Sequence, residues 1–251
     1  LSINATNGSI DVSASTVATY NVTYTTTGTC PNSTSKSITI SSLDNATFNY
    51  AATTYCPSGT DPTPTVSGLT GGTFSFAPFG MSINASTGTI DLSGTIPKSY
   101  SVTYTTNGSC PNSASQSIVL NPSDDASFNY SNSNFCLSSA DQTPNISGLT
   151  GGVFSSTPAG LSLNTSTGFV DISASTLGNY VVTYTTNGTC PTSMNRNFSI
   201  SNFDDATFNY SNASFCAFET NTTPTITGAL GGTFTSSPIG LSLSGSTGYI
   251  N

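Results

Sequence analysis

A repeat interval of 80 residues constrains this sequence more than any other feature. Near-copies of one phrase begin at Leu1, Met81, Leu161 and Leu241, and they read LSINATNGSID, MSINASTGTID, LSLNTSTGFVD and LSLSGSTGYIN. The register holds without insertion or deletion. A fixed period of this kind requires each copy to be one structural unit or a circular permutation of one. The sequence therefore predicts a tandem array, and the function belongs to the array.

The cysteines follow the same interval in two series. In a chain without histidine, six cysteines at repeat-locked positions indicate disulfides formed in an oxidising compartment rather than metal ligands. Buried free thiols are the alternative. One series is Cys30, Cys110 and Cys190, and the other is Cys56, Cys136 and Cys216.

The charge balance excludes nucleic-acid binding. The chain has 3 Lys and Arg residues against 11 Asp and Glu residues, which gives a net charge of -8. Neutralising a phosphate backbone requires clustered cations. In addition, no apolar run approaches the roughly 18 residues that cross a bilayer, so this segment is not expected to insert into a membrane.

Catalysis is not expected either. Without histidine, the Ser-His-Asp and Cys-His arrangements and the common zinc sites are excluded. Asp11, Asp91 and Asp171 share one repeat position, but Asn251 occupies it in the fourth copy. An essential catalytic acid is not interchangeable with an amide, so the sequence predicts no enzyme.

Alternating apolar and polar residues predict β-strands. In the segment YSVTYTT, Tyr100, Val102 and Tyr104 alternate with hydroxyl residues, which is the period of a half-buried strand. Residues 81–92 alternate on both sides of an Asn-Ala-Ser-Thr-Gly turn, and this predicts a hairpin closed by Gly88 at positive φ.

Further strands are predicted in ATFNY, PTVSG, GTFSF and QSIVL, separated by Gly, Pro and Asn-Gly turns. No apolar helical spacing persists over three turns. About seven short strands per repeat indicate an all-β fold of tandem immunoglobulin-like antiparallel β-sandwiches, arranged as a rod.

Polar junctions at residues 44–45, 124–125 and 204–205 provide the natural domain boundaries. On this register, residues 44–123 and 124–203 are complete immunoglobulin-like domains. Residues 1–43 are then the C-terminal part of one such domain, and residues 204–251 are the N-terminal part of another. Each domain begins with the ATFNY-type strand.

Two further residue sets are candidates for specific roles. Tyr20, Tyr100 and Tyr180 open the penultimate strand after a turn, as in the tyrosine corner, where the hydroxyl bonds back to the backbone; a sugar-stacking aromatic is the alternative.

The acid pairs at the junctions are candidate calcium ligands, because Ca²⁺ takes six to eight oxygens; a solvated turn is the alternative. These pairs are Asp124 with Asp125 and Asp204 with Asp205. Calcium is the only cofactor that the sequence suggests, and no metal site is favoured.

The favoured cysteine pairing lies within each domain. It joins Cys56 to Cys110 and Cys136 to Cys190, which requires the first-strand region and the turn before the last strand to meet at one pole. Cys30 and Cys216 are then left to partners outside the sequence. The competing pairing, Cys30 with Cys56 and its copies, crosses a domain junction.

The stretch GLSLNTSTGFVDISASTLGNYVVTYTTNG, residues 160–188, resembles the core of putative-Ig, cadherin-like domains of large bacterial surface proteins. The phrases GGTFS and TYTTNGTCP are similar to repeats in giant adhesins of Bacteroidetes, including gliding-motility adhesins of the SprB type. The resemblance covers essentially the whole chain, and its motifs are turns, strand faces and cysteines. It implies an extracellular stalk or fibre at the bacterial cell surface and identifies no ligand.

The expected function is therefore structural: a stalk segment of a large surface adhesin that projects a distal adhesive region for attachment or gliding. Its partners would be neighbouring repeats of the same chain, and like chains in a fibre. One alternative is a module with a glycan- or surface-binding site in each copy, which would gain by multivalency. The other is a self-assembling extracellular filament subunit.

Overall fold

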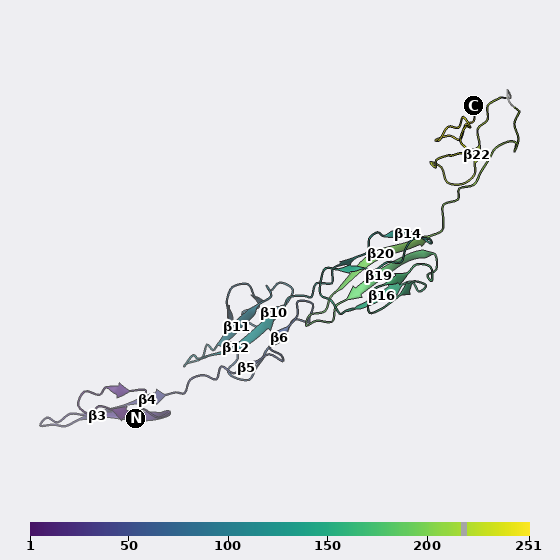
Figure 1. Cartoon of the computed structure of the whole chain (residues 1–251). Helices are drawn as coiled ribbons and strands as arrows, with labels where there is room; N and C mark the ends of the chain where they lie inside the picture. The colour runs from purple at the N-terminus through teal and green to yellow at the C-terminus, as the bar shows by residue number, and fades with distance from the viewer. Residues whose placement is uncertain (217–219) are drawn as a thin grey trace. The chain divides into compact units, whose positions relative to one another are not determined.

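The computed structural model describes residues 1–216 and 220–251, and within them every regular element is a β-strand (Figure 1). No helix that could span a membrane occurs among those residues. The chain divides into two compact units. One contains Leu1–Asp124 with Gly188–Pro191, and the other contains Asp125–Asn187 with Thr192–Asn251.

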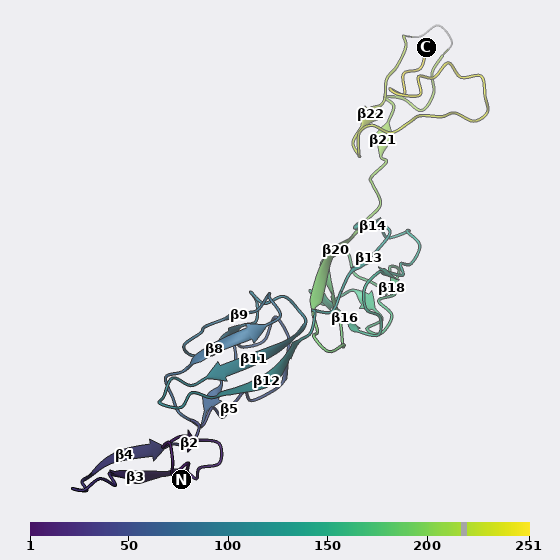
Figure 2. The ribbon, with the colours of Figure 1, turned by 90° about the vertical axis from the view of Figure 1, so that its left-hand side faces the viewer.

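The first sandwich consists of β5 to β12. A four-stranded sheet has the order β6-β12-β11-β8, and β6 runs parallel to β12 while the other neighbours are antiparallel. Figure 2 shows β8, β11 and β12 side by side. The pairs β5-β7 and β9-β10 form separate small sheets. The strands are β5 (Phe48–Asn49), β6 (Thr54–Tyr55), β7 (Thr65–Val66), β8 (Thr73–Ala77), β9 (Ser82–Ile83), β10 (Ile90–Asp91), β11 (Ser99–Thr105) and β12 (Ser113–Leu120).

The second sandwich, β13 to β20, repeats this topology. Its four-stranded sheet has the order β14-β20-β19-β16, again with one parallel pair, between β14 and β20. The strands are β13 (Phe128–Asn129), β14 (Asn134–Cys136), β15 (Asn145–Ile146), β16 (Val153–Thr157), β17 (Ser162–Leu163), β18 (Val170–Asp171), β19 (Gly178–Thr185) and β20 (Ser193–Ser201).

The predicted alternation in YSVTYTT is confirmed. Tyr100, Val102 and Tyr104 are buried along β11, and their neighbours in sequence face away from the core. The predicted hairpin is also confirmed, because β9 pairs antiparallel with β10 and Gly88 has φ of 74°. The Asn84 side chain accepts hydrogen bonds from the Ser86 and Thr87 amides and so closes that turn.

Aromatic rings fill the space between the two layers of each sandwich. In the first, the ring centroid of Phe74 lies 5.5 Å from that of Phe48 and 4.6 Å from that of Tyr104. Phe48 belongs to the β5-β7 pair, and the other two rings belong to the four-stranded sheet, so the contact joins the layers. The second sandwich repeats the cluster with Phe128, Phe154 and Tyr184 at 5.3 and 4.5 Å. The fold is all-β with repeated sandwich units, as the sequence predicts.

Buried residues of the first core come from Ala46 to Leu120, and those of the second come from Ala126 to Ile200. The predicted domain limits at residues 44, 124 and 204 stay a prediction. Strands β6 and β14 were not predicted from the sequence, because two or three residues are too few to show an alternating pattern.

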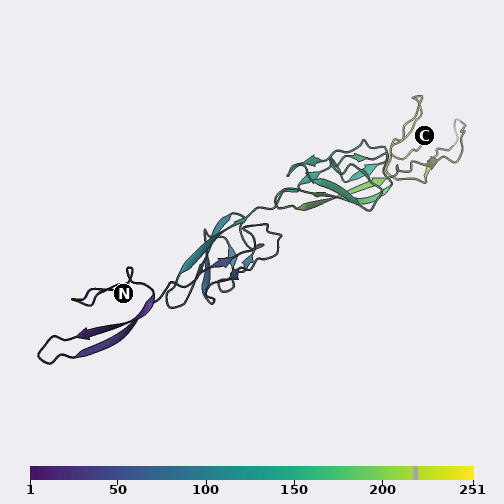
Figure 3. The same cartoon turned by 90° about the horizontal axis from the view of Figure 1, so that it is seen from below.

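The terminal segments contain copies of parts of this sandwich. Residues 1–43 form the pair β1-β2 and the hairpin β3-β4, which Figure 3 shows in purple. The corresponding strands are β1 (Ser2–Ile3), β2 (Ile10–Asp11), β3 (Ala18–Thr25) and β4 (Ser33–Ile40). Residues 204–251 contain the pair β21-β22 (Phe208–Asn209 and Thr225–Ile226). Tyr24 of β3 is 71% exposed, whereas its repeat equivalent Tyr104 is 1% exposed.

Each buried tyrosine near the end of β11 and β19 is also a hydrogen-bond anchor. The Tyr104 hydroxyl donates to the Leu69 carbonyl at 2.7 Å and accepts from the Gly72 amide at 2.8 Å. Tyr184 makes the same two bonds with Leu149 and Gly152 at 2.6 and 2.9 Å. A Cβ on Gly72 would lie 2.8 Å from the Tyr104 hydroxyl, so glycine is needed for this close approach.

We predict that Tyr104→Phe destabilises the first sandwich by about 1 to 3 kcal/mol, because it leaves a buried amide and carbonyl without their shared partner. The matched control is Tyr24→Phe at the equivalent exposed position, which should change stability by less than about 0.5 kcal/mol. Urea unfolding of both variants measures the difference. Equal midpoints for the two variants would contradict the anchoring role.

Candidate functional site

Hydrogen bonds within the loop between β19 and β20 fix its conformation. The Thr186 amide donates to the Thr192 carbonyl at 2.9 Å, and the Thr192 amide donates to the Thr186 hydroxyl at 2.9 Å. The loop between β11 and β12 is closed in the same way by Thr106 and Asn112. The TTNG-X-Cys-Pro phrase of the repeat, in which X is Ser or Thr, thus encodes a closed loop that presents a cysteine at its tip.

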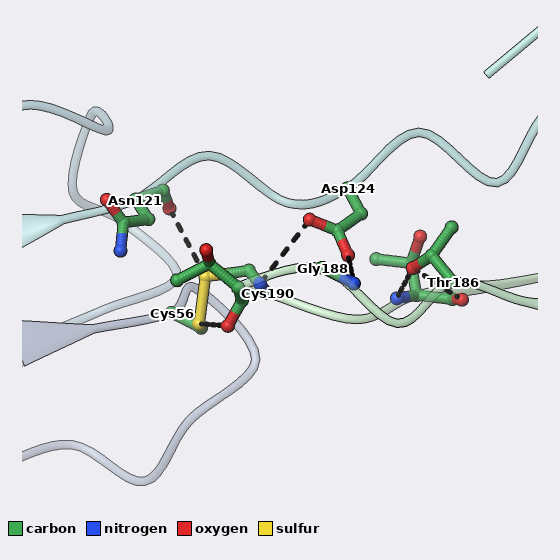
Figure 4. The surroundings of a disulfide bond; sticks show 8 residues. Cys56, Asn121, Asp124, Thr186, Gly188 and Cys190 are labelled. Carbon is green, nitrogen blue, oxygen red and sulfur yellow. Dashed lines mark hydrogen bonds between the residues drawn. A yellow bond between two sulfur atoms is a disulfide. The ribbon is translucent and has the colours of Figure 1, made fainter. Parts of the chain in front are cut away.

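Asp124, the first acid of the junction, holds this loop. Its amide donates to the Cys190 carbonyl at 2.9 Å, and its carboxylate accepts from the Gly188 amide at 2.9 Å and from the Cys190 amide at 3.4 Å (Figure 4). Hydrogen bonds to an ionised acceptor are stronger than those between neutral groups. The carboxylate therefore fixes the loop backbone, and with it the position of the Cys190 side chain.

Asp44 holds the preceding loop with the same kinds of contact. Its amide donates to the Cys110 carbonyl at 2.8 Å, and its carboxylate accepts from the Gly108 amide at 3.0 Å and the Thr106 hydroxyl at 2.9 Å. This role of the junction aspartates was not predicted from the sequence, which suggested calcium ligands or a solvated turn at residues 124–125 and 204–205. The available signal was that an aspartate occupies the first junction position at 44, 124 and 204 without exception.

One disulfide is formed among the described residues, between Cys56 and Cys190, with a Cα–Cα distance of 5.4 Å and a sequence separation of 134 residues. Cys190 is 1% exposed. The loop tip Gly188–Pro191 belongs to the compact unit that contains Cys56. Figure 4 shows the bond beside Asn121, whose carbonyl oxygen lies 3.9 Å from the Cys190 Sγ atom. The bond ties the β19-β20 loop of the second sandwich to the residue that follows β6 in the first.

The predicted pairing of Cys56 with Cys110, and of Cys136 with Cys190, was wrong in this structure. Tyr55 pairs with Leu120 at the C-terminal end of β12, whereas Cys110 precedes the N-terminal end of that strand. Eight residues of β12 span about 26 Å, far beyond the roughly 7 Å that a disulfide allows between Cα atoms. The two cysteines therefore lie at opposite ends of one sandwich. The same separation by β20 keeps Cys136 from Cys190.

The other four cysteines are free: Cys110 is half-buried, and Cys30, Cys136 and Cys216 are exposed. The competing pairing of Cys30 with Cys56 does not occur. The prediction that Cys30 and Cys216 bond to partners outside the sequence stays a prediction.

Two of the calcium candidates, Asp125 and Asp205, accept hydrogen bonds from the local backbone. The hydroxyl and amide of Ser127 hydrogen-bond to Asp125 and lower the pKa of its carboxyl group, and the Thr207 hydroxyl and amide do the same for Asp205. Asp204 is exposed at the position equivalent to Asp124. In the described part of the chain, no three His, Cys, Asp or Glu side chains gather as a metal site would require.

The tyrosine-corner interpretation is confirmed. The Tyr100 hydroxyl donates to the Ile96 carbonyl at 2.6 Å, and the Tyr180 hydroxyl donates to the Thr176 carbonyl at 2.7 Å. Tyr20 makes the same bond to Thr16 at 2.9 Å. Tyr100 and Tyr180 are buried, so neither ring offers a face for stacking on a sugar.

Comparison with known proteins gives distant structural matches. No protein-family model matches the chain, and no curated protein matches its sequence. Protocadherin gamma B2 domains 3-6 are 15% identical over 74% of this chain and 60% of that chain, with a TM-score of 0.30. Domains 22-24 of mouse cadherin-23 are 14% identical over 77% of each chain, with a TM-score of 0.29. The extracellular domain of protocadherin gamma B4 is 13% identical over 92% of this chain and 49% of that chain, with a TM-score of 0.30.

We predict that non-reducing peptide mapping of the folded chain recovers Cys56 linked to Cys190. Closing a loop of 134 residues stabilises the folded state by about 5 kcal/mol on the chain-entropy model, so reduction should lower the melting temperature. The control is Cys136→Ser, which should leave that temperature unchanged because Cys136 is free. Recovery of Cys56 linked to Cys110 would contradict the assignment.

Proposed function

We propose that this chain is a stalk segment of a large extracellular adhesion protein at a bacterial cell surface, which projects a distal adhesive region for attachment or gliding. The proposal includes no catalytic activity. The repeat, the all-β sandwiches and the disulfide support an exported structural protein, since disulfides persist in oxidising compartments. The bacterial surface is inferred from the resemblance of the repeat phrases.

The observation that carries the proposal is the disulfide between Cys56 and Cys190. A pull on the two ends of the chain passes from residue 56 directly to residue 190 through the sulfur atoms. Residues 57–189, which include most of both sandwiches, are then excluded from the covalent path under tension. Such a path lets a stalk keep its length under tension, because residues 57–189 cannot be extended. A protein that only presents binding sites does not need it.

The contacts that recur between copies are structural, and the exposed polar positions vary. A hollow of about 350 Å³ in the second sandwich is lined by Tyr130, Arg196 and several asparagines. Arg196 donates to the Phe128 carbonyl at 2.9 Å, and its equivalents in the other copies are Lys36 and Gln116. A ligand site in every copy would keep its polar contacts, because an unpaired polar group costs affinity. This variation favours the stalk over the multivalent module.

We predict that reduction of the disulfide adds about 450 Å to the extended length of the full chain in single-molecule pulling, because residues 57–189 enter the loaded path. The double variant Cys56→Ser with Cys190→Ser should show this longer extension with or without reductant. Equal extension of the oxidised and reduced wild-type chain would contradict the proposal that the disulfide carries the tension.

We also predict that the oxidised full chain shows no saturable binding on a glycan array, because the aromatic side chains of the two complete sandwiches are anchored in the core or vary between copies. The comparison protein is a lectin of known specificity applied to the same array. Saturable binding that Arg196→Gln abolishes would replace the stalk with a binding module whose site is the hollow at Arg196.

A further inference from the structure

Two loops of the repeat contain an asparagine followed by a glycine. Asn107 and Gly108 lie between β11 and β12, and Asn187 and Gly188 lie between β19 and β20. This dipeptide is prone to self-modification, because glycine has no side chain to hinder the attack of its backbone nitrogen on the preceding carboxamide. Each pair lies in a loop that a junction aspartate holds.

The contact with Asp44 requires a glycine at position 108. A Cβ on Gly108 would lie 2.5 Å from a carboxylate oxygen of Asp44 and 2.6 Å from the Leu69 side chain. The asparagine is not required in the same way, because the first copy of the loop has Thr27 at the position of Asn107. The close approach that fixes the loop therefore also places a reactive glycine after Asn107.

The nitrogen that would attack is bound to a carboxylate in both loops. The Gly108 amide donates to Asp44 at 3.0 Å, and the Gly188 amide donates to Asp124 at 2.9 Å, as Figure 4 shows for the second loop. The Asn107 side chain, in contrast, is exposed to water and has no hydrogen bond within the described part of the chain. The aspartate thus controls the nucleophile, and nothing protects the group that it would attack.

We propose that Asn107 and Asn187 are latent sites of self-modification, which the junction aspartates keep unreactive while the loops are in place. In the reaction, the glycine nitrogen forms a bond to the asparagine Cγ atom. Its proton passes through water to the departing amide group, which leaves as ammonia. Water then opens the succinimide ring at either carbonyl and gives aspartate or isoaspartate. One water enters and one ammonia leaves, with no oxidant or reductant.

The hydrogen bond to the carboxylate slows ring closure for two reasons. Ring closure removes the proton that Gly108 donates, so the bond to Asp44 is lost on the way to the transition state. The carboxylate also disfavours the negative charge that develops on the nitrogen as its proton leaves. A hydrogen bond to a charged group contributes enough stability that its loss slows a reaction step by about tenfold or more.

A modified loop no longer fits its aspartate. Isoaspartate adds one CH₂ group to the main chain of a loop that Thr106 and Asn112 close. Either product also adds a carboxylate next to the residue that Asp44 binds, and like charges repel. A loop that stays open long enough to react therefore does not return to its original contacts. Asn187 gives the loop that carries the disulfide the same property.

The experiment keeps the oxidised full chain at physiological temperature and pH and follows the Asn-Gly pairs by peptide mapping with mass spectrometry. We expect Asn107 and Asn187 to react at least about tenfold more slowly in the folded chain than in the chain unfolded by urea. Asn7 is the internal reference, because the Gly8 amide that follows it donates to the neutral Asn4 carbonyl at 2.8 Å.

Asp44→Asn tests the carboxylate itself. This variant removes the charge but keeps the backbone amide that donates to the Cys110 carbonyl at 2.8 Å. We expect the folded variant to react at least about fivefold faster at Asn107, with unchanged rates at Asn187 and Asn7. Asn107→Thr, which introduces the residue of the first copy, should abolish the reaction at position 107 and leave the melting temperature unchanged.

Asp124→Asn should have the reverse effect, with a faster reaction at Asn187 and an unchanged rate at Asn107. The two variants together separate the proposal from a general loss of stability. Global unfolding would speed up both sites in either variant, whereas release of one loop changes only the site of the substituted aspartate.

Three results would overturn the proposal. Equal rates in the folded and the unfolded chain would show that the loops give no protection. An unchanged rate at Asn107 in Asp44→Asn would show that the carboxylate is not the protecting group. A slower reaction at Asn107 in that variant would show that the carboxylate acts as a base that promotes ring closure.

Discussion

The fold depends on side chains that form hydrogen bonds with the backbone amides and carbonyls that strand pairing leaves without a partner. Most strands outside the four-stranded sheets are only two residues long, so ladder bonds reach few of the loop amides and carbonyls. Buried tyrosines bond these groups instead. Tyr104 bonds the 69–72 turn, and Tyr50 donates to the Gly88 carbonyl. Each tyrosine therefore fills the core with its ring and fixes a turn at the edge of the core with its hydroxyl. Without that hydroxyl, the unpaired amide and carbonyl groups of the turn would offset much of the free energy that burial of the ring contributes.

At the surface, short polar side chains form hydrogen bonds with the backbone of the turns in the same way. Asn84 closes the β9-β10 turn, and Asp91 accepts from the Ser93 hydroxyl and the Gly94 amide in the next turn. These bonds hold the pKa of Asp91 below its ordinary value. They also explain the composition, since a chain with 6% charged residues and many Asn, Ser and Thr residues can supply such contacts at every turn. The acids and amides that recur at these turns therefore have a structural role.

The sequence predicts those strands and turns whose residue pattern is long enough to show a period or a turn motif. The alternation along β11 and the Asn-to-Gly turn after Ile83 each express a local rule, and both are confirmed. The disulfide could not be derived in this way, because it depends on which end of β12 each cysteine reaches, and β6 sets that end through a two-residue parallel pairing. The role of Asp124 was missed for a related reason. Its partners are amides 64 and 66 residues away, and no local motif marks them.

The disulfide also changes what a cut in the backbone does to the molecule. Exposed loops rich in small and polar residues are the usual sites of proteolytic nicking. A single cleavage anywhere from residue 57 to residue 189 leaves both products joined through Cys56 and Cys190, so the chain stays one covalent molecule from its first residue to its last. The sandwich strands then hold the nicked loop in place by their remaining pairing. A cut within this loop therefore does not separate residues 1–56 from residues 190–251.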